Sequence, residues 1–156
     1  MPQDDYQSPR TLARFILRET LFGSLGTEGE RGYPFVSVVG LAAMPDGAPA
    51  ILVSNQARHT LNVRKDPRVS LLLLEKPHAE DPLTVARLTV SGAAEPIDKE
   101  LMRQRYLMRH PEAIKYAAQP DYVFWRVNID RGHLIGAFGR TSDLAVEDLI
   151  GGPAKP

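Results

Sequence analysis

The chain alternates between short apolar runs and polar segments that contain many prolines and glycines, a pattern typical of a strand-rich domain. The expected strands cover residues 33–43, 50–54, 69–75, 84–94, 121–130 and 132–138. A turn at residues 44–47 joins the first two into a hairpin. The run at residues 69–75 is almost continuously apolar, which favours a strand buried on both faces. Gly92 indicates a β-bulge within the fourth strand.

Helical periodicity is present near the N-terminus and again between the fourth and fifth expected strands. Ser8 and Pro9 are residue types that cap and open a helix, and apolar residues follow them at helical spacing. The expected helices cover residues 9–22, 98–110 and 111–117, with a loop over residues 24–32. Regular strand–helix repeats are absent from this order, so we expect a mainly β fold rather than a doubly wound sheet: an antiparallel barrel with flanking helices.

Residues 54–74, with the sequence SNQARHTLNVRKDPRVSLLLL, place a short helical segment between two apolar strands. Arg58, His59 and Thr60 fall at the start of this helix, where free backbone N–H groups and the helix dipole favour an anion. The segment therefore predicts a phosphate-binding site. An ordinary surface helix cap fits the same residues, and Asn62 fits a local capping role.

Three further positions carry chemistry of interest. Arg87 lies in an apolar strand, either exposed on an edge or directed at an anionic ligand. His110 and His133 fit either a haem or metal ligand or an ordinary hydrogen-bonded histidine, and neither has a second ligand at metal-binding spacing. The chain has no GxSxG nucleophile elbow, no GxGxxG and no phosphate-binding P-loop. No catalytic residue and no metal site can be assigned from these patterns.

The amino-acid composition limits which binding partners and which cellular compartment we expect for the protein. Apolar residues make up 43% of the 156 residues, and 19 basic residues balance 19 acidic ones. This balance predicts neither nucleic acid nor an anionic membrane as a partner. The absence of cysteine excludes disulfides and thiolate chemistry and fits a reducing compartment. No apolar run has the length of a membrane span, so we expect a cytoplasmic protein.

The same patterns predict one domain over residues 10–149. Residues 1–9 are polar and acidic, and we expect a flexible N-terminus there. Residues 150–156 contain glycine and proline, and we expect a disordered tail.

Five segments in order resemble one known family: YPFVSVV at 33–39, DGAPAILVSNQARHTLNVRKDPRVSLLL at 46–73, RLTVSGAAEPI at 87–97, RYLMRHPEAIKY at 105–116 and GAFGR at 136–140. Together they resemble the pyridoxamine 5′-phosphate oxidase-like FMN-binding split barrel, in its haem-utilisation (HugZ-type) branch. The resemblance extends over residues 10–149. It implies a six-stranded antiparallel split barrel that forms a homodimer with FMN sites between the subunits.

The resemblance also implies which residues line the cofactor. The first strand lies along the flavin, Ser54 lies near the ribityl chain, and the helix start lies near the phosphate. Arg87 corresponds to a flavin-contacting glutamine of the oxidases. The residues implied to bind cofactor are Ser37, Val38, Val39, Ser54, Arg58, His59, Thr60, Arg87, Phe138 and Arg140. The oxidases have Arg-Lys where this chain has His59-Thr60.

The function implied is that of an FMN-dependent oxidoreductase acting on a small molecule. The oxidases' C-terminal product-binding segment has no counterpart here, which argues against vitamin B6 as substrate. Haem binding and breakdown is the alternative, and it would use His110, His133 or no histidine. A non-catalytic flavin or haem carrier fits the same residues.

Overall fold

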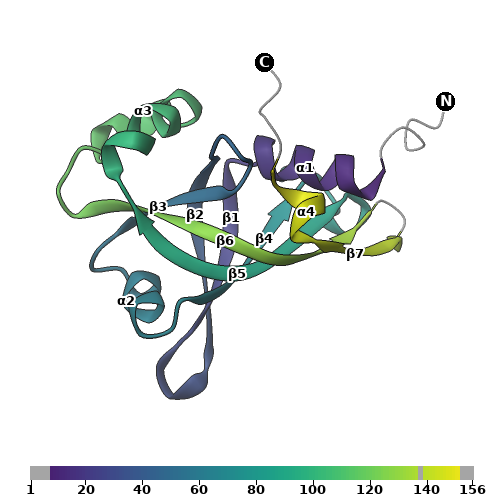
Figure 1. Ribbon diagram of the computed structural model, residues 1–156, viewed down its shortest axis with the longest axis horizontal. Coiled ribbons are helices and arrows are strands. Elements are labelled where there is room, and N and C mark those ends of the chain that lie inside the picture. Colours follow the sequence, from purple (N-terminus) through teal and green to yellow (C-terminus); the bar gives the residue numbers. More distant parts are fainter. Residues whose placement is uncertain (1–7, 137–138, 152–156) are drawn as a thin grey trace.

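Six strands close into an antiparallel barrel in the computed structural model, which describes residues 8–136 and 139–151. The strands are β1 (Phe22–Glu28), β2 (Pro34–Ala43), β3 (Pro49–Ser54), β4 (Arg68–Leu74), β5 (Arg87–Ile97), β6 (Tyr122–Ile135) and β7 (Thr141–Ala145). They are paired in the order β3-β2-β1-β4-β5-β6-β7, and β3 also pairs with β6, which closes the barrel and leaves β7 outside (Figure 1). The predicted fold class is confirmed.

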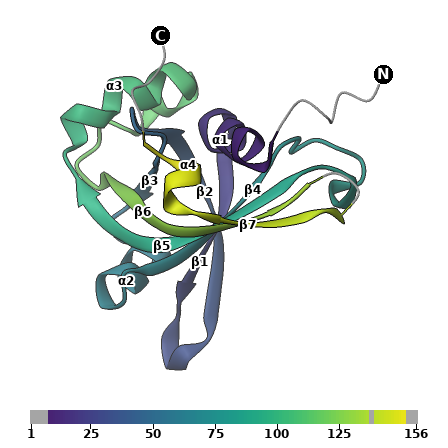
Figure 2. The same ribbon diagram turned by 45° about the vertical axis from the view of Figure 1, so that its right-hand side comes forward.

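Helices flank this barrel on several sides. The α-helices are α1 (Pro9–Glu19), α2 (Arg58–Lys65), α3 (Lys99–Arg109) and α4 (Val146–Leu149), and the short 3₁₀ helices are η2 (Glu30–Gly32), η3 (Pro82–Thr84) and η4 (Pro111–Lys115). The helices α1 and α4 lie together, while α3 and α2 lie away from them (Figure 2). None of the helices in the described ranges has the length and apolar character needed to cross a membrane.

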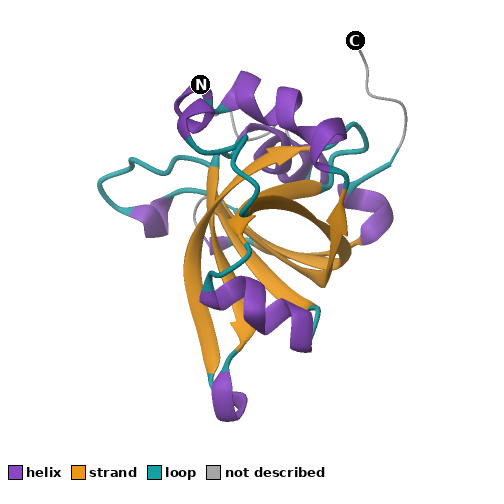
Figure 3. Ribbon diagram, turned by 90° about the vertical axis from the view of Figure 1, so that its left-hand side faces the viewer, coloured by secondary structure: helices purple, strands orange, loops and turns teal. Residues whose placement is uncertain are grey.

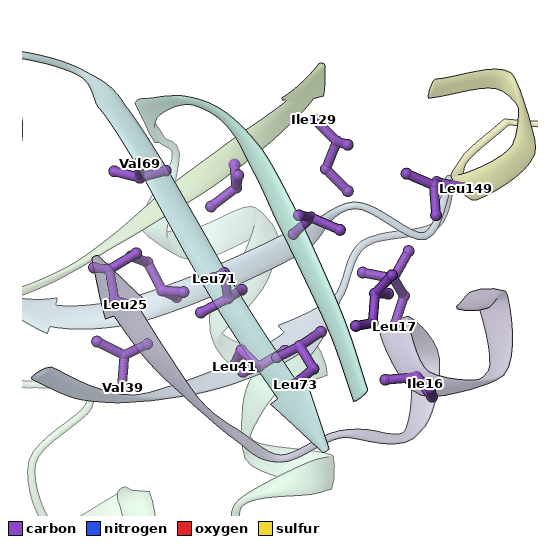
Figure 4. Close-up of a cluster of buried hydrophobic side chains, with 14 of the residues drawn as sticks. Ile16, Leu17, Leu25, Val39, Leu41, Val69, Leu71, Leu73, Ile129 and Leu149 are labelled. Atoms are coloured by element: carbon purple, nitrogen blue, oxygen red, sulfur yellow. The ribbon is translucent and has the colours of Figure 1, made fainter. Parts of the chain in front are cut away.

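The main core fills the barrel interior. Side chains from alternate positions of the strands meet there, among them Leu25, Leu41 and Leu71 (Figure 4). Helix α1 adds Ile16 and Leu17 to the same cluster. Its predicted start is confirmed, because the Ser8 hydroxyl accepts a hydrogen bond from the Thr11 amide at 3.2 Å.

A second, smaller core lies outside the barrel, under α3. Met102 and Tyr106 of this helix pack on Leu52 of β3 and Phe124 of β6. As a result, β3 is the strand buried on both faces. The prediction of a doubly buried strand at residues 69–75 is wrong, because β4 alternates between buried and exposed side chains and Leu72 is 38% exposed.

The strand β1 replaces the predicted end of the first helix and the loop after it. Helix α1 stops at Glu19, and the chain then runs extended between β2 and β4. Leu21 and Phe22 continue the helical spacing in the sequence, and for this reason the sequence pattern predicted a helix that extends too far. Gly23 favours this close pairing, since a Cβ there would lie within 3 Å of the Leu71 and Leu73 side chains and 3.1 Å from the Leu72 carbonyl oxygen. A glycine lets β1 approach β4 without displacing these groups.

The C-terminal half of the sheet also differs from the prediction. Residues 121–130 and 132–138 were expected to form two strands, whereas β6 runs unbroken from Tyr122 to Ile135, and β7 follows it. The predicted bulge at Gly92 is confirmed, because the β5–β6 register shifts between Ser91 and Gly92. Asp130 of β6 is the extra residue, since Ser91 is opposite Arg131 and Gly92 is opposite Ile129.

Candidate functional site

The predicted residues near α2 are held together by hydrogen bonds that link distant parts of the chain. The Ser54 hydroxyl at the end of β3 donates to Asp121 Oδ2 at 2.5 Å, just before β6 begins. The Thr60 hydroxyl in the first turn of α2 donates to the Ser54 carbonyl at 2.6 Å. Asn62, in the same helix, donates to Thr27 of β1 at 3.0 Å. Ser54 and Thr60 therefore fix the path from strand to helix, and their donor hydrogens are already used.

His59 has one satisfied ring nitrogen and one orphan. Its Nδ1 lies 2.8 Å from the Ser37 hydroxyl of β2, whereas its Nε2 is buried without a hydrogen-bond partner. Burial lowers the pKa of His59, which keeps the imidazole neutral at pH 7. A buried polar atom without a partner costs free energy, and such atoms often mark a site where a ligand supplies the partner.

The start of α2 is open to an anion. Ala57 at the N-cap has no side chain that could accept from the first amides, and the first turn contains no acidic residue. Arg58 is 53% exposed at its side chain and pairs with Glu30 Oε1 at 2.5 Å. A hollow of about 330 Å³ lies beside this pair and is also lined by Tyr33 and Phe35. An anion here would compete with Glu30 for the Arg58 guanidinium.

The two valines of the predicted flavin strand face opposite sides of β2. Val39 is 3% exposed and belongs to the barrel core, whereas Val38 is 73% exposed on the outside. Ser37 faces the same side as Val39 and is partly buried against His59. Of these three, Val38 alone presents its side chain to solvent.

The remaining predicted residues lie at the opposite end of the sheet. Arg87, at the start of β5, is opposite Ile135 and donates to the Pro82 carbonyl at 3.2 Å. Arg140 is exposed just before β7, and α2 and β7 lie on opposite sides of the molecule (Figure 1). Phe138 lies outside the described residues. A single copy of the chain therefore does not bring Arg87 and Arg140 to α2.

A broad solvent-facing surface connects these two ends. We call it the outer face: the side of β2, β1, β4, β5 and β6 that points away from the barrel interior. One cross-strand row on it contains Val38, Ser24, Leu72, Thr89 and His133. The barrel is seen from another side in Figure 3. The outer face combines exposed apolar side chains with small polar ones.

A groove of about 880 Å³ crosses the outer face beside this row. Small residues line it, among them Gly26, Ser70, Ser91 and Gly92, together with Arg131. Its size is in the range of sites for drug-sized and cofactor-sized ligands. Sequence patterns did not reveal the groove, because the small residues that line it come from three different strands, β1, β4 and β5.

The two histidines considered as haem ligands have different surroundings. His110 is 8% exposed, its Nε2 lies 2.8 Å from the Leu41 carbonyl, and its ring stacks on Tyr106 at 4.2 Å. Burial lowers the pKa of His110. This histidine joins α3 to the barrel, and its Nε2 is already engaged by the Leu41 carbonyl. His133 lies on the outer face, where its Nδ1 is 2.7 Å from Asp143 Oδ1.

Comparison with known proteins places the chain in a family. A family model described as the CREG β-barrel matches residues 4–150. The chain belongs to the CREG β-barrel family. It is 33% identical over 125 residues to the non-canonical heme oxygenase HOZ of Arabidopsis thaliana chloroplasts, covering 77% of this chain and 38% of HOZ. It is 29% identical over 140 residues to the heme oxygenase HutZ of Vibrio cholerae, covering 85% of this chain and 78% of HutZ.

Solved structures agree with this relationship. A heme-binding protein from Mycobacterium smegmatis superimposes with a TM-score of 0.80 at 32% identity, over 91% of this chain and 60% of that protein. A Clostridium acetobutylicum protein of the pyridoxinephosphate oxidase family shares the fold, with a TM-score of 0.64 at 16% identity, over 83% and 88% of the two chains. The predicted kinship with split barrels and with haem-utilisation proteins is confirmed.

Proposed function

We propose that this chain binds haem and breaks it down with molecular oxygen. The observation that carries the proposal is the similarity to two proteins named heme oxygenases over most of this chain. The matched region spans 38% of the length of HOZ. The predicted alternative, haem binding and breakdown, is therefore preferred to the FMN-dependent oxidoreductase.

The outer-face groove is the proposed haem site. Its small residues leave room for a flat ring. Arg68 and Arg131 also line it, and because they pair with Asp66 at 2.5 Å and Asp130 at 3.4 Å, the two propionate groups would compete with these carboxylates for the guanidinium groups. The porphyrin supplies four ligands to iron, so the protein needs to add one side chain.

In the proposed reaction, oxygen oxidises and opens the porphyrin ring and iron is released. The electrons come from an external reductant of the ascorbate or NAD(P)H-coupled kind. The role of the chain's own residues is to bind and orient the ring on the outer face, while Arg68 and Arg131 hold its carboxylates. If haem binds tightly but survives reductant and oxygen, a carrier role replaces the oxygenase role.

FMN is the second candidate, and a specific observation favours it. Arg58 and the orphan Nε2 of His59 lie at the open start of α2, where a phosphate would find both a cation and a hydrogen-bond partner. The hydroxyls of Ser54 and Thr60, by contrast, already donate to protein oxygens. When bound, FMN supplies hydride or electron transfer.

One pair of titrations separates these two functions. We expect haem to bind at one equivalent per chain, with a shifted Soret band, and ascorbate with oxygen then to bleach that band and release iron to a ferrous chelator. Titration with FMN, followed by flavin fluorescence, is the matched measurement. Unshifted haem spectra together with quenched flavin fluorescence would overturn the haem proposal in favour of FMN.

We also propose that two copies pair through the outer face and share the cofactor sites. Val36 and Val38 of β2 are 67% and 73% exposed there, next to small residues of β1. Such an apolar patch is typical of a surface covered by a partner. Pairing would let the α2 region of one copy meet the Arg87 region of its partner.

The cytoplasmic location expected from composition stays a prediction.

Light scattering after size exclusion tests the pairing. We expect twice the 17.3 kDa mass of one chain for the wild type, and a monomer for Val38→Glu, because an unpaired carboxylate would be buried between the copies. Leu101→Glu is the matched control, since Leu101 is 81% exposed on α3, away from the outer face. A wild-type monomer, or an unchanged dimer in Val38→Glu, would refute the pairing.

A further inference from the structure

The β-bulge decides which way the end of β6 faces. Before the bulge, odd-numbered residues such as Val127 and Ile129 point into the barrel. Continued alternation would bury His133 as well. Because Asp130 is an extra residue, even-numbered residues such as Leu134 turn inward after it, and His133 turns to the outer face. The bulge therefore presents an imidazole beside the groove.

Asp143 pairs with this imidazole at the surface, and its own side chain is 92% exposed. The two residues are directly opposite in the β6–β7 pairing, and Asp143 Oδ1 lies 2.7 Å from His133 Nδ1. A carboxylate on Nδ1 favours the tautomer with the proton on that nitrogen and leaves the Nε2 lone pair free. The His133 side chain is 47% exposed, so Nε2 is the part of the ring available to a ligand.

The other three histidines of the chain lack this combination of a fixed ring and an open nitrogen. His110 is buried and its Nε2 already contacts the Leu41 carbonyl. His59 Nε2 is buried between α2 and β2, where a porphyrin has no access. His78 is exposed in the segment between β4 and η3, without a hydrogen bond to any described residue. His133 alone among the four histidines both pairs with a carboxylate, that of Asp143, and exposes its ring to solvent.

We propose that His133 Nε2 is the axial ligand of the haem iron and that Asp143 is its positioning residue. This inference rests on the haem-binding function proposed above and assigns its site. Binding forms one Fe–N bond and displaces water from the iron, with no change of oxidation state. Arg131 lies two residues from His133 on the same side of β6, at the edge of the groove, within reach of a propionate.

Haem titration of single variants tests the ligand assignment. We expect His133→Gly to weaken haem affinity by about 100-fold and to lose the histidine-ligated spectrum, and added imidazole to restore that spectrum. Asp143→Asn should weaken affinity by about 10-fold, lower the iron–histidine stretching frequency and raise the reduction potential, because the carboxylate makes the imidazole a stronger donor. His78→Gly is the matched control and should bind like the wild type.

The outcomes separate the ligand assignment from the function. If the wild type binds haem and His133→Gly binds it equally with an unchanged spectrum, another residue is the ligand, while haem binding stands. If Asp143→Asn leaves the iron–histidine frequency and the potential unchanged, Asp143 does not position the ring. If the wild type binds no haem, both proposals are refuted. Circular dichroism of each variant checks that the barrel remains folded.

Discussion

Gly92→Ala is expected to lower the melting temperature of the protein by about 6–12 °C, the largest effect that we predict for a single methyl group. A Cβ at this position would lie 2.0 Å from the Asn128 carbonyl oxygen and 3.0 Å from Ile129 Cα. Both are backbone atoms of β6, so relief requires the two strands to separate at the bulge. Overpacking of this kind costs about 3 kcal/mol, and each kcal/mol shifts the midpoint by about 2–4 °C in a protein of this size.

Gly26→Ala is the control for this prediction. Gly26 lines the same groove from β1, but a Cβ there would lie 3.6 Å from its nearest neighbour, the Ser70 carbonyl oxygen, at ordinary contact distance. We expect the melting temperature of the Gly26→Ala variant, measured by calorimetry, to stay close to that of the wild type. Equal midpoints for Gly26→Ala and Gly92→Ala would show that β6 yields at the bulge, contrary to the prediction.

The sequence predicted the strands that coincide with dense apolar runs. The hairpin of β2 and β3, and the strand β4, all follow such runs. The strand β1 was missed because propensity and spacing favoured a longer helix. What places it in the sheet is pairing with β2 and β4, and Gly23 leaves room there for the side chains of Leu71 and Leu73, distant in the chain. Such close packing between distant segments leaves no local signal.

In the candidate site, too, neighbouring residues could be predicted from the sequence, whereas contacts between distant residues could not. The residues at the start of α2 are contiguous, so the segment could be singled out from the sequence. Its anchors could not, because Ser37 and Asp121 lie 22 and 67 residues from the groups they contact. The direction of His133 depends on one extra residue in β6, which reverses the alternation that the sequence displays. Gly92 indicated a bulge, but not which strand would contain the extra residue.

The contact between α3 and the barrel predicts a second large effect, on Gly40 of β2. A Cβ on Gly40 would lie 2.1 Å from the Tyr106 hydroxyl oxygen. Tyr106 is 2% exposed and its ring stacks on His110, which holds the Leu41 carbonyl, so the ring has little freedom to retreat. Burial also raises the pKa of Tyr106, which keeps the phenol neutral. We expect Gly40→Ala to lower the free energy of unfolding by about 1–3 kcal/mol.

Removing the hydroxyl should remove most of this cost. In Tyr106→Phe, the nearest ring atom to a Cβ on residue 40 would be Cζ at 3.4 Å, an ordinary contact. Tyr106→Phe alone should change stability little, since the hydroxyl has no hydrogen-bond partner among the described residues. The double variant should therefore be nearly as stable as Tyr106→Phe, and a urea-unfolding cycle measures the coupling. Additive losses in the double variant would mean that Gly40 is required by the strand itself, and not by the tyrosine above it.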